Sequence, residues 1–311
     1  MSEKEGVMRE FSSRSSALVT QSYALEIADI VIAVFGDIPE IKLQVEGAKK
    51  DFLIDKGAPD VTVRAAWKDL SNEAWGRKLF DSNALWQLYD RDGSYTFLFS
   101  SVVFGSVPYK AASFNRDFTT GKVYLHPSFF DPHQPVDPME YPLDELLITN
   151  LLARGKGMEI HACGVIAPSG DGYLFVGQSG AGKTTMAKIL QENGFKILSD
   201  DRTILRHSDN RFWICGTPWH GEAELASPER APLKRIFFLH HGTRNEVRRP
   251  KATETAANLF ASSFVPFHSS DGLDFTLGFL ERLTGAVPCD ELRFTPDERI
   301  VKFIEGLKDE D

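Results

Sequence analysis

Residues Gly177–Thr184 read GQSGAGKT and fit the pattern G-x-x-x-x-G-K-[ST]. This is the phosphate-binding P-loop motif, in which glycines let the backbone aim N–H groups at phosphate oxygens. Lys183 is expected to neutralise the β- and γ-phosphates of a nucleotide, and the hydroxyl of Thr184 to hold Mg²⁺. The positive end of the following helix favours the same anion. The motif therefore predicts a nucleotide-binding core.

The residues on either side of the motif fit the strand–loop–helix context that it requires. Tyr173–Val176 is a short apolar run, typical of a buried strand. Thr185–Leu190 has helix-compatible spacing, and Asn193 with Gly194 resembles a helix C-cap. The alternative is an ordinary glycine-rich turn between a strand and a helix. We expect nucleotide contacts from nine consecutive residues: Gly177, Gln178, Ser179, Gly180, Ala181, Gly182, Lys183, Thr184 and Thr185.

Two acids follow the next expected strand. That strand, Phe195–Ser199, runs directly into Asp200 and Asp201. Phosphoryl transfer needs carboxylates both for Mg²⁺ and for the nucleophile. Neighbouring residues on a strand face opposite sides, but at a strand end one carboxylate can meet the metal while the other bends toward the substrate. The alternative is a polar turn after the strand.

Two further stretches supply candidate site residues. His161 begins the strand that precedes the motif strand, although a single histidine is more often structural than catalytic. Gly216–Glu222 reads GTPWHGE, a fixed loop that carries the imidazole of His220 and the carboxylate of Glu222. Such loops can contact a substrate or a metal. The alternative is a rigid turn with Trp219 packed in the core.

The net negative charge of the chain bears on whether its partner is a nucleic acid. The 311 residues carry a net charge of −9, and the pI is near 5.5. A nucleic-acid-binding surface needs clustered Lys and Arg, so this balance argues against one. The one basic cluster, Arg244–Lys251, is short and is expected to be a solvated loop or a patch for a small anionic ligand.

The hydrophobic pattern and the cysteines indicate where the protein is expected to act. No stretch approaches the ~18 apolar residues of a membrane span. The first residues lack the pattern of a signal peptide. Cys163, Cys215 and Cys289 form neither a zinc pattern nor a disulfide framework. We therefore expect a cytoplasmic protein with buried thiols that does not act at a membrane.

The first part of the chain is predicted to be β-rich and antiparallel. Short strand-like stretches separated by Asp, Gly and Asn occur up to about residue 130. They are Tyr23–Phe35, Val61–Arg64, Tyr95–Phe99 and Lys122–Leu125. The proline-rich segment Asp131–Pro138 is a candidate boundary. We expect one domain over residues 1–140, which could select a substrate or partner, and a second over residues 141–311.

The second domain is predicted to be α/β. Pro142–Ala153 has the pattern of an amphipathic helix, with Asp144 and Glu145 in its first turn, where the helix dipole favours acids. Strands and helices then alternate. The expected strands and helices are Ile160–Ile166, Tyr173–Val176, the motif helix, Phe195–Ser199, Thr203–Arg206, Arg211–Cys215, Lys234–Leu239, Thr253–Ser262 and Gly272–Leu283. This order indicates an α/β or mixed nucleotide-binding core.

Taken together, these motifs resemble the catalytic domain of HPr kinase/phosphorylase and its relatives. The shared pattern is a histidine opening a strand at Ile160-His161-Ala162, then G-x-S-G-x-G-K-[ST] at Gly177–Thr184, then the acidic pair at Asp200-Asp201. The resemblance covers about residues 141–311. It implies a P-loop kinase core of the HPr kinase/PEP carboxykinase type, preceded by an N-terminal β-rich domain.

The resemblance also implies a role for each matching residue, with ATP and Mg²⁺ as cofactors. Lys183 and the loop amides hold the phosphates, and Thr184 with Asp201 binds Mg²⁺. Asp200 takes the proton from an attacking hydroxyl, and His161 lies near the transferred phosphate. Which aspartate is the base and which is the metal ligand stays open.

The chain also departs from that family. HPr kinases carry a Glu-x-x-Gly-x-Gly pattern after the acidic pair, where this chain has Gly216–Glu222. The difference places in doubt both HPr as the substrate and the reverse phosphorylase activity, and indicates a divergent branch. PEP carboxykinase shares the loop but is considerably longer, and we find no second substrate half here. Because HPr kinases form hexamers, self-association is a further expectation.

The expected function is therefore transfer of the γ-phosphate of ATP to a serine-type hydroxyl. The acceptor is a protein, a peptide or a small molecule, and the sequence does not separate these. His220, Glu222, Arg248 and Arg249 are the residues expected to contact it. A non-catalytic nucleotide sensor or scaffold is the alternative, which the intact acidic pair disfavours.

Overall fold

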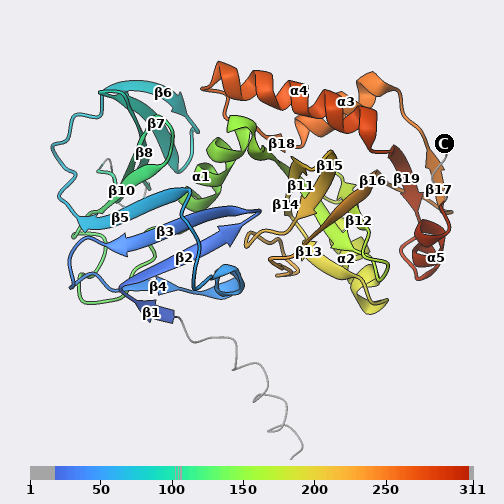
Figure 1. Cartoon of the computed structure of the whole chain (residues 1–311), viewed down its shortest axis with the longest axis horizontal. Helices are drawn as coiled ribbons and strands as arrows, with labels where there is room; N and C mark the ends of the chain where they lie inside the picture. The colour runs from blue at the N-terminus through green and yellow to red at the C-terminus, as the bar shows by residue number, and fades with distance from the viewer. Residues whose placement is uncertain (1–17, 102, 104, 106, 308–311) are drawn as a thin grey trace, which may run out of the picture. The chain divides into compact units, whose positions relative to one another are not determined.

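The computed structural model describes residues 18–101, 103, 105 and 107–307 (Figure 1). The chain divides into two compact units, with the division between Asp144 and Glu145. It falls inside helix α1 (Leu143–Leu151) and not in the proline-rich segment Asp131–Pro138. Both units contain β-sheets, and the second also contains most of the helices. The chain is thus a mixed α/β protein with several sheets.

The first unit is built on an eight-stranded sheet of described residues, in the order β2-β3-β5-β10-β9-β8-β7-β6. A second sheet pairs β1 with β4, and a short 3-10 helix, η1, follows β4. The bounds are β1 Leu18–Thr20, β2 Ser22–Ile27, β3 Ile30–Gly36, β4 Leu43–Val45, η1 Gly47–Phe52, β5 Val61–Trp67, β6 Arg77–Asp81, β7 Trp86–Arg91, β8 Ser94–Phe99, β9 Lys110–Asn115 and β10 Thr120–Leu125.

The expectation of a wholly antiparallel first sheet is wrong. Strand β5 runs parallel to both of its neighbours, β3 and β10. A parallel pair needs a long crossover, and residues 37–60, which contain β4 and η1, provide it between β3 and β5. The alternation that predicts these strands is the same for either direction of pairing, so the sequence pattern could not distinguish them.

The stretch Tyr23–Phe35 is a hairpin. Strands β2 and β3 pair antiparallel, and the chain turns at Ala28 and Asp29, which both have positive φ. A two-residue hairpin loop needs such angles because they match the twist of the strands. The predicted alternation is confirmed, since Leu25 and Ile27 are buried while Glu26 between them is only half-buried.

The described residues of the second unit form nine strands, and two of these, β11 and β16, take part in two sheets. The N-terminal half of β11 pairs with β14 and β18, and its C-terminal half pairs with β12 and β13. Strand β16 likewise pairs first with β15 and then with β12 and β19. The bounds are β11 Gly157–Ile166, β12 Gly172–Val176, β13 Lys196–Ser199, β14 Arg202–Ser208, β15 Arg211–Cys215, β16 Arg230–His241, β17 Glu246–Arg248, β18 Ser263–Phe264 and β19 Cys289–Phe294.

Helices pack against these strands in two groups. Helix α2 (Lys183–Glu192) and helix α5 (Arg299–Glu305) share one apolar core with β12, β16 and β19. Helix α3 (Ala252–Ala261) and helix α4 (Ser270–Ala286) belong to a second core, which also takes in β14 and β15. Figure 1 shows α3 and α4 close together and away from α2 and α5. After α1, one turn of π-helix, η2 (Leu152–Lys156), leads into β11.

Three parallel strands, β12, β16 and β19, position the motif. Strand β12 lies inside the sheet, between the antiparallel β11 and the parallel β16. All five of its residues are buried, as expected for such a strand. The motif loop leaves the carboxyl end of β12 and leads into α2. In open α/β sheets, ligands bind outside the carboxyl ends of parallel strands, so this edge of the sheet is the place to look for a site.

Candidate functional site

The segment Gly177–Thr184, here called the glycine loop, has a backbone that other residues could not easily adopt. Gly180 and Gly182 have φ values of +82° and +102°, in the left-handed region that favours glycine. A Cβ on Gly182 would also lie 2.8 Å from the ring of Phe294. At Gly177 the limit is close packing, since a Cβ there would lie 2.8 Å from Ala181 Cβ. The glycines are thus required by the shape of the loop.

Lys183 is the first residue of α2, and its side chain folds back over the glycine loop. Its ammonium donates to the carbonyl of Gly177 at 2.6 Å and to that of Gln178 at 3.5 Å. The residue is only 8% exposed, and burial holds the pKa of Lys183 below its ordinary value, with the charge of Asp201 acting in the opposite direction. An anion in the loop would give this ammonium the counter-charge that the buried site otherwise supplies only in part.

A cavity of about 530 Å³ opens beside the glycine loop. Its size lies within the range of small-molecule sites. It is lined by residues from the end of β12, the loop, the end of β16 and the end of α3: Val176, Gly177, Gln178, Ser179, Gly180, Ala181, Phe238, Leu239, His240, His241, Asn258, Ala261 and Ser262. The ring of His241 also contacts the loop, because its Nε2 donates to the carbonyl of Gly180 at 2.8 Å.

The acidic pair lies in the tight turn between β13 and β14, and Ser199 shapes that turn. The Ser199 hydroxyl accepts from the backbone N–H groups of Asp201 and Arg202, at 3.1 and 3.0 Å. The same hydroxyl donates to the carbonyl of Trp219 at 2.8 Å, which ties the turn to the loop Gly216–Glu222. The two carboxylates therefore leave the turn in different directions.

Asp200 points into the protein. It is 2% exposed, and its two oxygens accept from the backbone N–H groups of Gly221 and Ala223, at 2.9 and 3.0 Å. A proton-accepting carboxylate must present a free lone pair to the substrate hydroxyl. The geometry of Asp200 instead suits an anchor that holds the Gly221–Ala223 segment.

Asp201 points toward His161 and is about a quarter exposed. Its Oδ1 lies 3.5 Å from His161 Nδ1, and its Oδ2 contacts the guanidinium of Arg202. Burial and the charge of Lys183 lower the pKa of His161. The imidazole is therefore neutral at pH 7, with Nδ1 facing Asp201 and Nε2 left to meet a ligand.

The sequence pattern predicts that His161 opens a strand. In the structure it is the fifth residue of β11. The strand begins earlier because Gly157–His161 pairs with β14, where His161 lies opposite Arg202. The backbone N–H of His161 also donates to the carbonyl of Ser262 at the end of α3. The residue is thereby fixed between the turn of the acidic pair and the cavity wall.

Asp144 and Glu145 lie in the first turn of α1, as the sequence predicts, and each also pairs with a cation. Asp144 pairs with Lys49 at 2.9 Å, within the first unit. Glu145 accepts from Arg202 Nε at 2.5 Å, next to the acidic pair. Contacts between residues so distant in the chain carry no local sequence pattern, and Ser199, Arg202 and His241 were missed for the same reason.

The loop Gly216–Glu222 contributes its backbone and not its charged side chains. His220 and Glu222 are both exposed. Trp219 is 7% exposed, which agrees with the alternative of an aromatic packed in the core. The loop thus supports the acidic pair, and neither His220 nor Glu222 lines the cavity beside the glycine loop.

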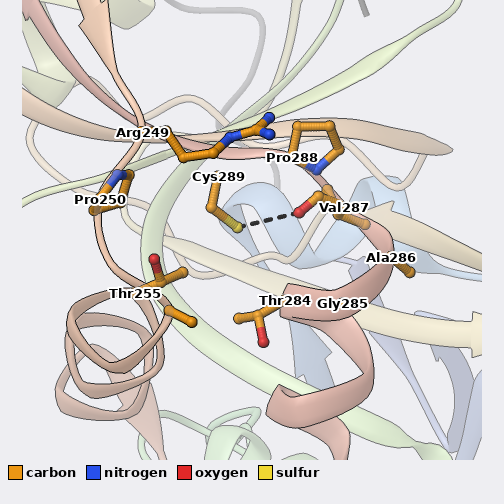
Figure 2. Close-up of a pocket in the computed structure, with 10 residues that line it drawn as sticks. Arg249, Pro250, Thr255, Thr284, Gly285, Ala286, Val287, Pro288 and Cys289 are labelled. Carbon is orange, nitrogen blue, oxygen red and sulfur yellow. Dashed lines mark hydrogen bonds between the residues drawn. The ribbon is translucent and has the colours of Figure 1, made fainter. Parts of the chain in front are cut away.

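Arg248 and Arg249 also lie apart from that cavity. Arg248 pairs with Glu291 at 2.9 Å on the edge strand β17. Arg249 lines a different cavity of about 370 Å³, formed by the beginning of α3, the end of α4 and the beginning of β19 (Figure 2). Neither arginine lines the cavity beside the glycine loop, and their expected contact with the acceptor stays a prediction.

The remaining expectations concern metals, thiols and membranes. Within residues that the structure describes, no group of three or more His, Cys, Asp and Glu side chains could hold a metal ion. Mg²⁺ does not need such a cage, because it binds through one or two carboxylates together with phosphates and water. All three cysteines are free and buried, and burial raises the pKa of Cys289 to about 12. The described helices include none that is long and apolar enough to cross a membrane.

Comparisons with known proteins leave the family open. No protein-family model matches the chain, and no curated protein matches its sequence. Among solved structures, the Hpr(Ser) kinase/phosphatase from Coxiella burnetii matches with 14% identity and a TM-score of 0.23, over 41% of this chain and 97% of that chain. A TM-score of this size carries no argument about the fold or the function.

Proposed function

We propose that the second unit is an ATP- and Mg²⁺-dependent phosphotransferase. The observation that carries the proposal is the glycine loop: Gly177–Ala181 line a cavity large enough for a nucleotide, and the buried Lys183 folds back over the loop. Backbone N–H groups in such a loop and the N-terminus of the following helix attract phosphate. The sequence motif and the three-dimensional setting thus point to the same ligand.

ATP and Mg²⁺ fit the residues present. Lys183 has a lowered pKa, and its ammonium donates to the carbonyls of Gly177 and Gln178, so the phosphates of a nucleotide would complete its charge pairing. Thr184, one residue further along α2, and the partly exposed Asp201 are the groups that would hold Mg²⁺. When bound, ATP supplies a transferable γ-phosphoryl group, and Mg²⁺ neutralises charge on its phosphates.

The geometry favours His161 over Asp200 as the proton acceptor. Asp200 is buried with both oxygens hydrogen-bonded, whereas His161 is more than a third exposed and neutral at pH 7. Asp201 orients the imidazole through Nδ1. In this proposal Nε2 receives the proton of a hydroxyl acceptor, and Asp200 keeps the neighbouring loop in place. The acceptor is a protein, a peptide or a small molecule.

The experiment is transfer of labelled γ-phosphate from ATP into a fractionated extract of the native cell. Wild type, Lys183→Met and His161→Asn are compared, with products read by mass spectrometry. We expect a labelled species with wild type only, while His161→Asn still binds ATP. Normal transfer by His161→Asn would remove the assigned role, and the absence of any ATP binding by wild type would contradict the phosphotransferase itself.

A nucleotide sensor is the second candidate, and the burial of Asp200 is the observation that favours it. A protein that only binds nucleotide needs no exposed base, and one of the two acids serves as an anchor. The first unit would then pass the nucleotide state to a partner. Tight ATP binding without any labelled product in the same experiment would support this candidate over the phosphotransferase.

A further inference from the structure

Arg202 stands at the centre of a cluster of acidic side chains behind the proposed site. Its Nε donates to Glu145 Oε1 at 2.5 Å, and Nη1 contacts Asp201 Oδ2. The guanidinium carbon lies 4.8 Å from the centre of the Phe264 ring, a cation–π contact. Only 16% of the side chain is exposed. The guanidinium thus contacts Glu145, Asp201 and Phe264, and of the two carboxylates Asp201 is the more exposed, at 24% against 8%.

Glu159 forms the innermost layer of this cluster. It is fully buried, and its Oε1 lies 4.0 Å from Arg202 Nε. Its Oε2 lies 2.8 Å from the Thr149 hydroxyl, which is also 2.9 Å from the carbonyl oxygen of Glu145. The Thr149 hydroxyl has a single hydrogen, so it can donate to only one of these two oxygens at a time.

Carboxyl groups outnumber the single positive charge of Arg202 in this cluster. Burial and the neighbouring Glu145 raise the pKa of Glu159 well above its ordinary value, which favours its neutral form. The positive charge of Arg202 is left to Glu145 and Asp201. Glu145 is 8% exposed, so its ion pair with Arg202 is strongly shielded from water. This pair gives the guanidinium a fixed orientation on the side away from Asp201.

We propose that Arg202 is a positioning residue, held by Glu145, that fixes the Asp201 carboxylate for contact with the nucleotide-bound metal ion. A metal ligand that is oriented by a neighbouring side chain binds its ion more tightly than one that rotates freely. Arg202 contacts Asp201 directly and reaches Lys183 through its charge, so its main effect is expected on the metal ligand. This inference rests on the proposed function in so far as Asp201 binds Mg²⁺.

The test compares the dissociation constant of ATP in Mg²⁺ with that in EDTA, by calorimetry. Removing Arg202 alone would leave Glu145 as an uncompensated buried charge, so the main variant is the neutral pair Glu145→Gln/Arg202→Gln. We expect its affinity in EDTA to equal that of wild type, and its gain in affinity on adding Mg²⁺ to fall by about tenfold or more. Asp201→Asn should show the same loss.

Arg299→Gln is the matched control. Arg299 is the first residue of α5 and forms an exposed ion pair with Asp297, which precedes the helix. It should keep the full effect of Mg²⁺. A full Mg²⁺ effect in the neutral pair variant, or an equal loss of affinity in Mg²⁺ and in EDTA, would overturn the positioning role. The second pattern would mean that the cluster only supports the fold.

A second measurement separates this inference from the proposed function. Melting temperatures without nucleotide are compared in a Glu145→Gln background, for Arg202→Gln, for Asp201→Asn and for these two substitutions together. If Arg202 holds Asp201, the shifts of the two single variants will not add in the double variant. If wild type binds no ATP, the proposed function fails, but the melting temperatures still show whether Arg202 and Asp201 interact. If the shifts add, the inference is overturned even in a protein that binds ATP.

Discussion

The backbone N–H of Gly221 donates to Asp200 Oδ1 at 2.9 Å, although the two residues are 21 positions apart. The contact is so close that Gly221 has no room for a side chain. A Cβ there would lie 2.8 Å from Asp200 Oδ2 and 3.3 Å from Asp201 Cβ. The loop and the acidic pair thus determine each other's shape.

Gly221→Ala is expected to disturb both acids at once. Overpacking of this kind costs about 1–3 kcal/mol, so the free energy of unfolding should fall by that amount in urea denaturation. Gly285→Ala is the control, because Gly285 lies in α4 and a Cβ there meets no atom within 4 Å. Unchanged stability of Gly221→Ala would show that the turn adapts and that the contact does not constrain the acids.

Lys183→Met should separate ligand binding from stability. A charge-assisted hydrogen bond to phosphate stabilises the bound nucleotide, and we expect its loss to raise the Kd of ATP by about 10- to 100-fold. The free energy of unfolding should not fall, because burial already disfavours the charged form of this lysine, as its lowered pKa shows. Calorimetry and urea denaturation measure the two quantities, and an unaltered Kd would contradict the place of the phosphates beside Lys183.

Local patterns of the chain predicted the glycine loop and its flanking elements well. The buried strand β12, the glycines and α2 are consecutive in sequence, so their propensities and spacing carry the whole arrangement. The predicted helices at α3 and α4 are also confirmed, within a few residues at each end. Strand β19 and helix α5 were not predicted, because β19 carries charges on both sides of its apolar residues and α5 has only seven residues.

The roles within the candidate site could not be read from local patterns. Asp200 and Asp201 are neighbours with the same chemistry, and only their distant partners distinguish them. The partners of Asp200 are 21 and 23 residues further on, and Glu145 is 57 residues from Arg202. The sequence could therefore place an acidic pair after the strand, but not say which acid is buried.

Arg249→Gln is expected to leave ATP binding intact. Arg249 lines the second cavity, at the opposite end of α3 from Asn258 and Ser262, which line the cavity beside the glycine loop. The Kd of this variant for ATP should lie within about twofold of the wild-type value, which is less than the loss of a direct contact would cause. A tenfold weaker Kd would show that Arg249 acts on the nucleotide although it lines the other cavity.

The three thiols should not react in the native protein. Cys163 and Cys215 are almost completely buried, and burial raises the pKa values of Cys163 and Cys289. Because the thiolate is the reactive species, a thiol reagent such as dithiobis-nitrobenzoate should label none of them in buffer and all three in urea. Rapid labelling of one cysteine in buffer would show that its part of the core opens under native conditions.

The last prediction concerns the stability of the protein in mild acid and depends on His268. Burial lowers the pKa of His268 to about 4, and the charge of Arg154 acts in the same direction. The unfolded chain has the ordinary value of about 6.5, so below pH 6.5 the unfolded state binds a proton that the folded state does not. This contribution to stability is complete above pH 6.5 and is lost as the pH falls toward 4.

Between pH 7.5 and pH 5, the wild type should therefore lose about 2 kcal/mol of its free energy of unfolding through this group alone. Carboxylates also begin to titrate in that range, so the quantity to measure is the difference between wild type and His268→Gln in urea denaturation at both pH values. The glutamine cannot gain a charge, and the variant should lose less stability than wild type on acidification. Equal losses would mean that His268 takes up a proton in the folded protein as readily as in the unfolded chain.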